Sequence, residues 1–183
     1  SFLLKTPDLD IGKLEVSINR LVEYHDAFRL KYKKASDASL ALNDSSYIQY
    51  YDNDFKVVEL KSLDIKTIKA KEGSKEFEET INELLSEWQS SFDLEHGPLY
   101  SVGYIYGYED GSSRIYFALH HLIADGISWR ILAEELKELY SQKDLNTKGT
   151  SYRQWVEAVE EYAASNQIEK SYWASVIIDH DNN

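Results

Sequence analysis

The chain has 183 residues, 43% hydrophobic and 28% charged, which suits one ordinary domain, or one lobe of a larger one, with a real core. Its formal charge of −12 repels phosphate backbones and anionic lipid on average, so we expect neither nucleic acid nor a membrane surface as a partner. The absence of cysteine excludes disulfides, thiolate zinc sites and a cysteine nucleophile.

The ends and the apolar runs of the chain give further expectations. No apolar run reaches transmembrane length, and the N-terminus lacks the build of a signal peptide, so we expect a cytoplasmic protein. The chain starts at Ser1 and contains no methionine, which favours origin from a longer polypeptide.

The first half of the chain alternates between strand and helix patterns. Residues 1–5 are an apolar run typical of a strand. Asp8 or Asp10 is placed to cap a helix that runs to about Tyr24, with apolar residues at three- and four-residue spacing. Residues 35–46 have the composition of a loop. Further strands are predicted at residues 27–34, 47–51 and 55–60.

The second half continues the alternation. Asp110-Gly111 is a strong hairpin signal between two predicted strands, residues 99–106 and 114–119. Ile131 and Leu132 are expected on the buried face of the helix that follows. The tail after residue 176 has no evident reason to be ordered alone. Helices are predicted at residues 71–92, 127–140, 152–163 and 167–176. The interleaving predicts a layered α/β or α+β fold, in a single unit spanning residues 1–183.

The stretch "YFALHHLIADGISWRIL" carries the most chemistry, because two adjacent histidines follow a predicted strand. Neighbouring side chains on a strand point to opposite faces, so His120 and His121 are poorly placed to share a metal ion. His121 and Asp125 can chelate only if helical, and no third ligand is evident, so we predict no metal site.

Two interpretations of this stretch remain open from the residues alone. In the structural one, Asp125 caps the next helix, Gly126 eases the turn, and His120 is a hydrogen-bonded core histidine. In the functional one, a neutral imidazole at a strand end acts as a general base in a cleft. We find no nucleophile-elbow serine and no glycine-rich phosphate loop, which points to proton transfer rather than covalent catalysis. The other histidines and the pair Glu134–Glu135 have a structural or solvated character.

The stretch also resembles a known signature. "HHLIADG" is similar to the HHxxxDG motif of the condensation-domain superfamily of nonribosomal peptide synthetases. Three other segments resemble the same superfamily in the right order: "EYHDAFRLKY" its RHExLRTxF segment, "FDLEHGPLYSVGYI" its FDLxxGPLLR segment, and "SYRQWVEAV" the segment after the helix. The details resemble epimerization domains more than condensation domains, since "HHLIADGISWRIL" is closer to HHLxxDGxSWRIL than to HHxxSDGWS.

The resemblance implies roles for individual residues. His121 would be the catalytic histidine at a tunnel between two lobes, and His120 would be structural. Asp125 would be structural, paired with Arg29 of "HDAFR", and Gly126 would permit a tight turn into a helix whose N-terminus brings positive charge near the site. The resemblance implies a chloramphenicol-acetyltransferase-like lobe. The second lobe, with its glutamate-bearing EGHGRE-type segment, would be missing from these residues.

The implied activity is inversion of the Cα of an aminoacyl or peptidyl thioester on a peptidyl carrier protein. The resemblance implies no directly bound cofactor, because the substrate arrives on the carrier's 4'-phosphopantetheine arm. The alternatives are a condensation domain that forms the peptide bond, a coenzyme A-dependent acyltransferase, and a non-catalytic lobe that docks a carrier protein. We expect the lobe alone to have little or no turnover.

Overall fold

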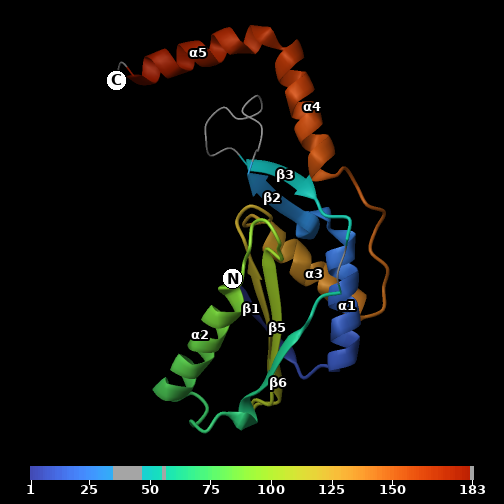
Figure 1. Ribbon diagram of the computed structural model, residues 1–183, viewed down its shortest axis with the longest axis vertical. Coiled ribbons are helices and arrows are strands. Elements are labelled where there is room, and N and C mark those ends of the chain that lie inside the picture. The colour runs from blue at the N-terminus through green and yellow to red at the C-terminus, as the bar shows by residue number, and fades with distance from the viewer. Residues whose placement is uncertain (35–46, 55–56, 182–183) are drawn as a thin grey trace. The chain divides into compact units, whose positions relative to one another are not determined.

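The computed structural model describes residues 1–34, 47–54 and 57–181, and the predicted loop at 35–46 lies outside these ranges. The chain divides into two compact units, Ser1–Asn146 and Thr147–Asn183. The first unit contains every strand that the structure describes, and it is built on a mixed four-stranded sheet (Figure 1).

The sheet has the strand order β1-β6-β5-β4. β1 is antiparallel to β6 and β6 is antiparallel to β5, whereas β4 is parallel to β5. Gly111 has φ +69° in the turn between β5 and β6, so the predicted hairpin is confirmed at a residue where glycine is favoured. The four strands are β1 (Phe2–Pro7), β4 (Lys61–Asp64), β5 (Tyr100–Tyr106) and β6 (Ser112–Leu119).

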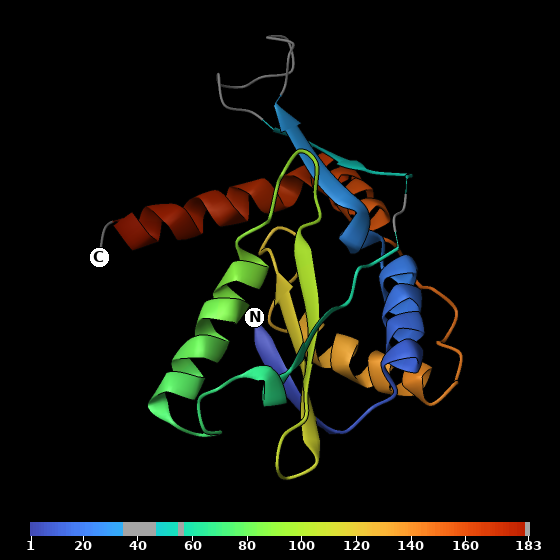
Figure 2. The ribbon, with the colours of Figure 1, turned by 60° about the horizontal axis from the view of Figure 1, so that its bottom comes forward.

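Helices cover both faces of this sheet. α1 and α3 lie on one face and α2 on the other (Figure 2). The side chain of Asp10 accepts a hydrogen bond from the Lys13 N–H, which confirms a predicted cap, and Ser74 caps α2 in the same way. The helices of the first unit are α1 (Ile11–Tyr24), α2 (Lys75–Gln89) and α3 (Ser128–Tyr140), with short 3₁₀ turns η1 (Asp26–Arg29) and η2 (Ile65–Thr67).

The alternation of side chains along β5 and β6 produces two cores. Toward α1 and α3, Tyr104 and Phe117 are fully buried. Toward α2, Gly103 leaves room for the Trp88 ring, since a Cβ at this glycine would lie 1.9 Å from Trp88 Cζ3. Tyr116 packs beside Trp88 with ring centroids 6.0 Å apart. The sheet is therefore fixed from both faces, which makes its ends rigid supports.

The hydroxyl of buried Tyr104 fastens the connection between β1 and α1. It accepts a hydrogen bond from the Leu9 N–H at 2.7 Å and donates to Asp8 Oδ1 at 2.9 Å. Burial raises the pKa of this phenol above its ordinary value.

Several predicted elements differ from the observed ones. The predicted strand at 27–34 starts only at Leu30, because residues 26–29 form η1, in which the Phe28 N–H donates to the His25 carbonyl at 3.2 Å. This strand, β2 (Leu30–Lys34), pairs with β3 (Tyr47–Tyr51) in a two-stranded ribbon. The predicted strand at 55–60 is wrong for its described residues 57–60, where the Val58 N–H donates to Asn19 Oδ1 at 2.7 Å instead of to a strand.

The second unit consists of α4 (Tyr152–Ser165) and α5 (Gln167–Asp181), close to the two predicted helices. A capping box begins α4, in which Ser151 and Gln154 bond each other's backbone N–H. α5 extends to Asp181, so the prediction that the tail after residue 176 has no order is wrong for its described residues 177–181. No helix in the described part of the chain is long and apolar enough to cross a membrane.

Candidate functional site

The loop at residues 120–127 joins β6 to α3 and carries most of the predicted site. Its first residues continue the hydrogen bonding of the sheet. The His120 N–H donates to the Leu99 carbonyl at 2.9 Å, and the Ile123 N–H donates back to the His120 carbonyl at 3.0 Å. The loop therefore starts from a fixed position at the end of the two central strands.

The His120 ring is held in place. It is half-buried and lies edge-on to Phe92, with ring centroids 6.2 Å apart. Its Nδ1 accepts a hydrogen bond from the Leu122 N–H at 3.2 Å, so this nitrogen carries no proton in this arrangement. These contacts give His120 a structural role in the loop.

The His121 side chain is exposed. Within the described residues, no hydrogen bond or ion pair is formed by its ring, in contrast to that of His120. Two apolar side chains of the same loop are also exposed, Leu122 at 48% and Ile127 at 65%. The adjacent histidines thus have different environments, one packed and one open.

Asp125 fixes the start of α3. Its Oδ1 accepts hydrogen bonds from the Ile127 and Ser128 N–H groups at 3.1 and 2.9 Å and from the Ser128 hydroxyl at 2.7 Å. The hydrogen bonds from Ser128 lower the pKa of this carboxyl below its ordinary value. The hydrogen bonds expected of a capping carboxylate are present, although the residue directly before α3 is Ile127, which has no side-chain cap hydrogen bond. Because this carboxylate already occupies the helix start, the predicted positive charge of the α3 N-terminus is compensated locally.

Gly126 does not need to be glycine for the turn. Its φ lies outside the left-handed region, and a Cβ there would meet no atom within 4 Å. The expectation that it permits a tight turn is therefore wrong.

Arg29 is not the partner of Asp125, so that predicted ion pair is wrong. The last residue of η1 is Arg29, and its Nη2 bonds Asp26 Oδ1 three residues earlier. Residues three apart lie above each other in a 3₁₀ turn, which explains this choice of partner. The Arg29 Nε is buried and has no hydrogen-bond partner among the described residues.

Sequence reasoning missed one polar contact that supports the site. His25 Nε2 lies 2.5 Å from Glu135 Oε2, which ties the end of α1 to α3. Glu135 is half-buried, whereas the sequence suggested a solvated helix face. Glu135 lies three residues after buried Leu132, so it stands beside the buried stripe of α3. The helical spacing of the sequence could therefore have indicated its partial burial. Ile131, expected on that stripe, is 38% exposed.

The described side chains contain no cluster of three or more histidine and acidic residues that could hold a metal ion. The arrangement at the end of β6 is instead an exposed imidazole beside apolar side chains, on a loop fixed by one packed histidine and one capped helix. Such an arrangement can accept and return a proton from a ligand that lies over the loop.

Comparisons with known proteins place these features in a family. The sequence model described as "Condensation domain" matches residues 1–182. The N-(5-amino-5-carboxypentanoyl)-L-cysteinyl-D-valine synthase of Penicillium rubens is 37% identical over 179 residues, which are 98% of this chain and 4% of that protein. Tyrocidine synthase 2 of Brevibacillus parabrevis is 32% identical over 93% of this chain and 5% of its own length.

Solved structures agree with this assignment. The crystal structure of the epimerization domain from the third module of tyrocidine synthetase B matches with a TM-score of 0.77 and 31% identity, over 95% of this chain and 38% of that domain. The starter condensation domain of rhizomide synthetase matches with a TM-score of 0.72 and 16% identity, over 94% and 40%, and shows the shared fold. The α/β lobe is thus of the predicted chloramphenicol-acetyltransferase-like type. The chain belongs to the condensation-domain family of nonribosomal peptide synthetases and corresponds to the N-terminal portion of such a domain.

Proposed function

We propose that the chain is the histidine-bearing lobe of an epimerization domain, which inverts the Cα of an aminoacyl or peptidyl thioester held on a carrier protein. The observation that carries this proposal is the open ring of His121, presented at the end of the rigid strand β6. The neighbouring His120, by contrast, is occupied with packing and a backbone hydrogen bond.

The chemistry requires one proton to leave Cα and another to arrive on the opposite face. A thioester acidifies the Cα–H, because the resulting carbanion delocalises into the carbonyl. In the proposed step, a neutral His121 ring nitrogen takes this proton and becomes imidazolium, and the electron pair of the C–H bond passes into the enolate. An acid from the remainder of the domain returns a proton to the other face. The reverse direction exchanges the two roles.

Two of the comparisons are consistent with epimerization. The epimerization domain of tyrocidine synthetase B is 31% identical to this chain, whereas the starter condensation domain of rhizomide synthetase is 16% identical. The synthases that are 36–37% identical, from Penicillium and Amycolatopsis lactamdurans, are named for a product that ends in D-valine. The substrate class, the carrier protein with its phosphopantetheine arm and the second lobe as partner are part of this proposal. The chain spans 38% of the epimerization domain and 4–5% of the synthases.

A second candidate is condensation, in which His121 would position or deprotonate an attacking amine. The description of the matched family model favours it. A lobe that only docks a carrier protein is the third candidate.

The test uses the full-length domain that contains this chain, with an L-aminoacyl carrier protein as substrate in D₂O. Epimerization predicts exchange of the Cα–H with deuterium and a mixture of thioester stereoisomers. His121→Gln should remove both signals, whereas Glu134→Gln, on the exposed face of α3, should keep them. Peptide product without exchange would instead identify condensation, and a His121→Gln variant with full exchange would contradict the proposal.

A further inference from the structure

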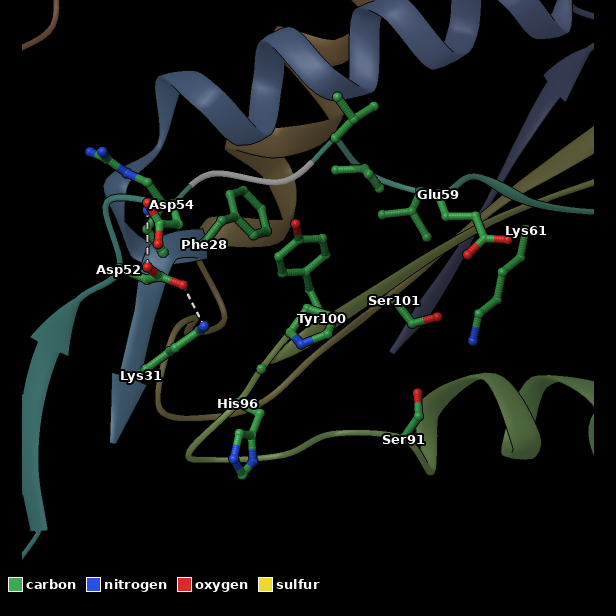
Figure 3. A pocket seen from close by; sticks show the side chains of 16 residues that line it. Phe28, Lys31, Asp52, Asp54, Glu59, Lys61, Ser91, His96, Tyr100 and Ser101 are labelled. Atoms are coloured by element: carbon green, nitrogen blue, oxygen red, sulfur yellow. Dashed lines mark hydrogen bonds and ion pairs between the residues drawn. The ribbon is translucent and has the colours of Figure 1, made fainter. Parts of the chain in front are cut away.

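A cavity opens where β4 and β5 separate. Pairing between the two strands starts at Lys61 opposite Gly103, and residues 57–60 run without strand pairing ahead of it. The first residues of β5 therefore have strand partners only on the β6 side, where Ser101 lies opposite Ala118. The space beside them is a cavity of about 400 Å³, which we term the β5-edge pocket (Figure 3).

Two of the cations of the β5-edge pocket are already neutralised. Lys31 forms an ion pair with Asp52, and Arg29 forms one with Asp26. Lys61 differs from both. Its Nζ donates to the Trp88 carbonyl near the end of α2 at 3.3 Å, and it forms no ion pair within the described part of the chain. An ammonium group has three N–H donors, so this half-buried cation retains donors for a ligand.

A buried hydroxyl lies next to this cation. Ser101 is 6% exposed, and its Oγ has no hydrogen-bond partner among the described residues. Burial of a polar group without a partner is unfavourable, so a partner supplied from outside would be stabilising. Figure 3 shows the hydroxyls of Ser91 and Ser101 directed into the same part of the pocket as the Lys61 amine, from three separate segments of the chain.

We propose that Lys61, Ser91 and Ser101 form a binding site for the oxyanion of a small organic anion, a phosphate or a carboxylate. One cation and two hydroxyl donors are the complement that such a group needs, since hydrogen bonds between charged partners are the stronger ones. The aromatic ring of Tyr100 lines the same cavity, so it can contact an apolar remainder of the ligand.

Glu59 allows a second test of the proposed anion site. This exposed carboxylate lines the same pocket but forms no ion pair with Lys61 in the structure. It opposes a bound anion through charge repulsion, so Glu59→Gln should bind the anion more tightly than the wild type. The site is independent of the proposed epimerization, because none of its residues belongs to the His121 loop.

The test is a titration of the chain, followed by the amide resonances of Lys61, Ser91 and Ser101, with phenyl phosphate, benzoate and neutral phenol as probes. We expect saturable shifts with phenyl phosphate or benzoate, and the tighter of the two identifies the oxyanion. Phenol should give no saturable shift. Ser101→Ala and Lys61→Gln should each weaken binding about tenfold or more. Lys5→Gln removes a cation whose partner is Asp110 in the distant hairpin turn, and it should leave the affinity unchanged.

Thermal melts separate loss of binding from loss of folding. Because the Ser101 hydroxyl has no partner in the free protein, Ser101→Ala should melt at the same or a higher temperature without a probe, yet gain less than the wild type from the preferred anion. Shifts that never saturate with either anion would overturn the site. So would equal affinities of the wild type and both variants, or a loss in Lys5→Gln as large as that in Lys61→Gln.

Discussion

The β5–β6 pair and the loop that follows it are neighbours in the chain but differ in the burial and contacts of their side chains. In the strand pair, the side chains of Tyr104 and Phe117 are fully buried between packed helices. In the loop, His121 is exposed, and the backbone is held by the local contacts of His120 and Asp125. The contrast teaches that one region supplies stability and the other presents the exposed imidazole that we propose as the reactive group.

The largest expected effect on stability is in the β5–β6 strand pair. Phe117 has 0% exposure and stacks on Phe2, with ring centroids 5.5 Å apart. Phe117→Ala should lower the free energy of unfolding by about 3–5 kcal/mol, because it removes buried area and leaves a cavity. Urea denaturation measures this, with Phe117→Leu as the milder control. A loss below about 1 kcal/mol in the alanine variant would show that the centre of the sheet is not tightly packed.

A matched pair of glycine substitutions sharpens the comparison. In Gly103→Ala the new methyl would overlap the Trp88 ring, and overpacking of this kind costs about 1–3 kcal/mol. In Gly126→Ala the methyl meets open space at an ordinary φ, so the change should stay within about 0.5 kcal/mol. Equal losses in the two variants, measured by the same denaturation, would remove the distinction between strand and loop.

Asp125 should make the loop sensitive to pH. Its pKa is lowered from 3.8 in the folded chain, so its stabilising contribution is present above that value and is lost as the pH falls through the folded pKa. Asp125→Ala should therefore lower the melting temperature at neutral pH, with a smaller difference from the wild type in strong acid. Melting temperatures across acidic pH measure this difference. Glu134→Gln, in the adjacent helix α3, is the control. A difference that is constant with pH would contradict the assigned hydrogen bonds.

The smallest stability effect is expected at His121, the proposed catalytic residue. His121→Gln should change the free energy of unfolding by no more than about 0.5 kcal/mol, because the ring is exposed. His120→Gln should cost more, since it removes the packing on Phe92 and alters the acceptor for the Leu122 N–H. Denaturation of the two variants side by side tests the order. The reverse order would mean that the roles of the two histidines are exchanged.

Local signals explain which parts of the fold are predictable from the sequence. The β5–β6 hairpin depends on Asp110-Gly111 and on a continuous apolar pattern, and the cap Asp10 acts within a few residues. The failed strand prediction at residues 55–60 depends on a distant partner. The N–H of Val58 bonds Asn19 in α1, so the apolar stretch around it is not a strand. The more polar residues 61–64 pair with β5 instead.

The candidate site is also predictable only in part, and here one failure is local. The separate environments of His120 and His121 follow from the alternation of a strand, and the capping by Asp125 follows from its distance to the helix. The partner of Arg29 does not, because it depends on the short η1 turn that replaces the start of a predicted strand. The β5-edge pocket is also beyond sequence reasoning, since the parallel pairing of β4 with β5 sets the position of Lys61 beside β5, while Ser91 comes from the segment after α2.

The hydroxyl of Tyr104 has a consequence at the opposite end of the pH scale. Because its pKa is raised in the folded chain, this phenol keeps its proton in alkali that would ionise it in the unfolded chain. Stability from this group is full below the unfolded value and declines as the pH rises towards the folded one. Burial also raises the pKa values of Tyr100, Tyr108 and Tyr116, so the contribution of Tyr104 to an alkaline titration followed by tyrosinate absorbance is the difference between the wild type and Tyr104→Phe. The Tyr104 hydroxyl thus makes the attachment of the first strand to the first helix sensitive to alkaline pH.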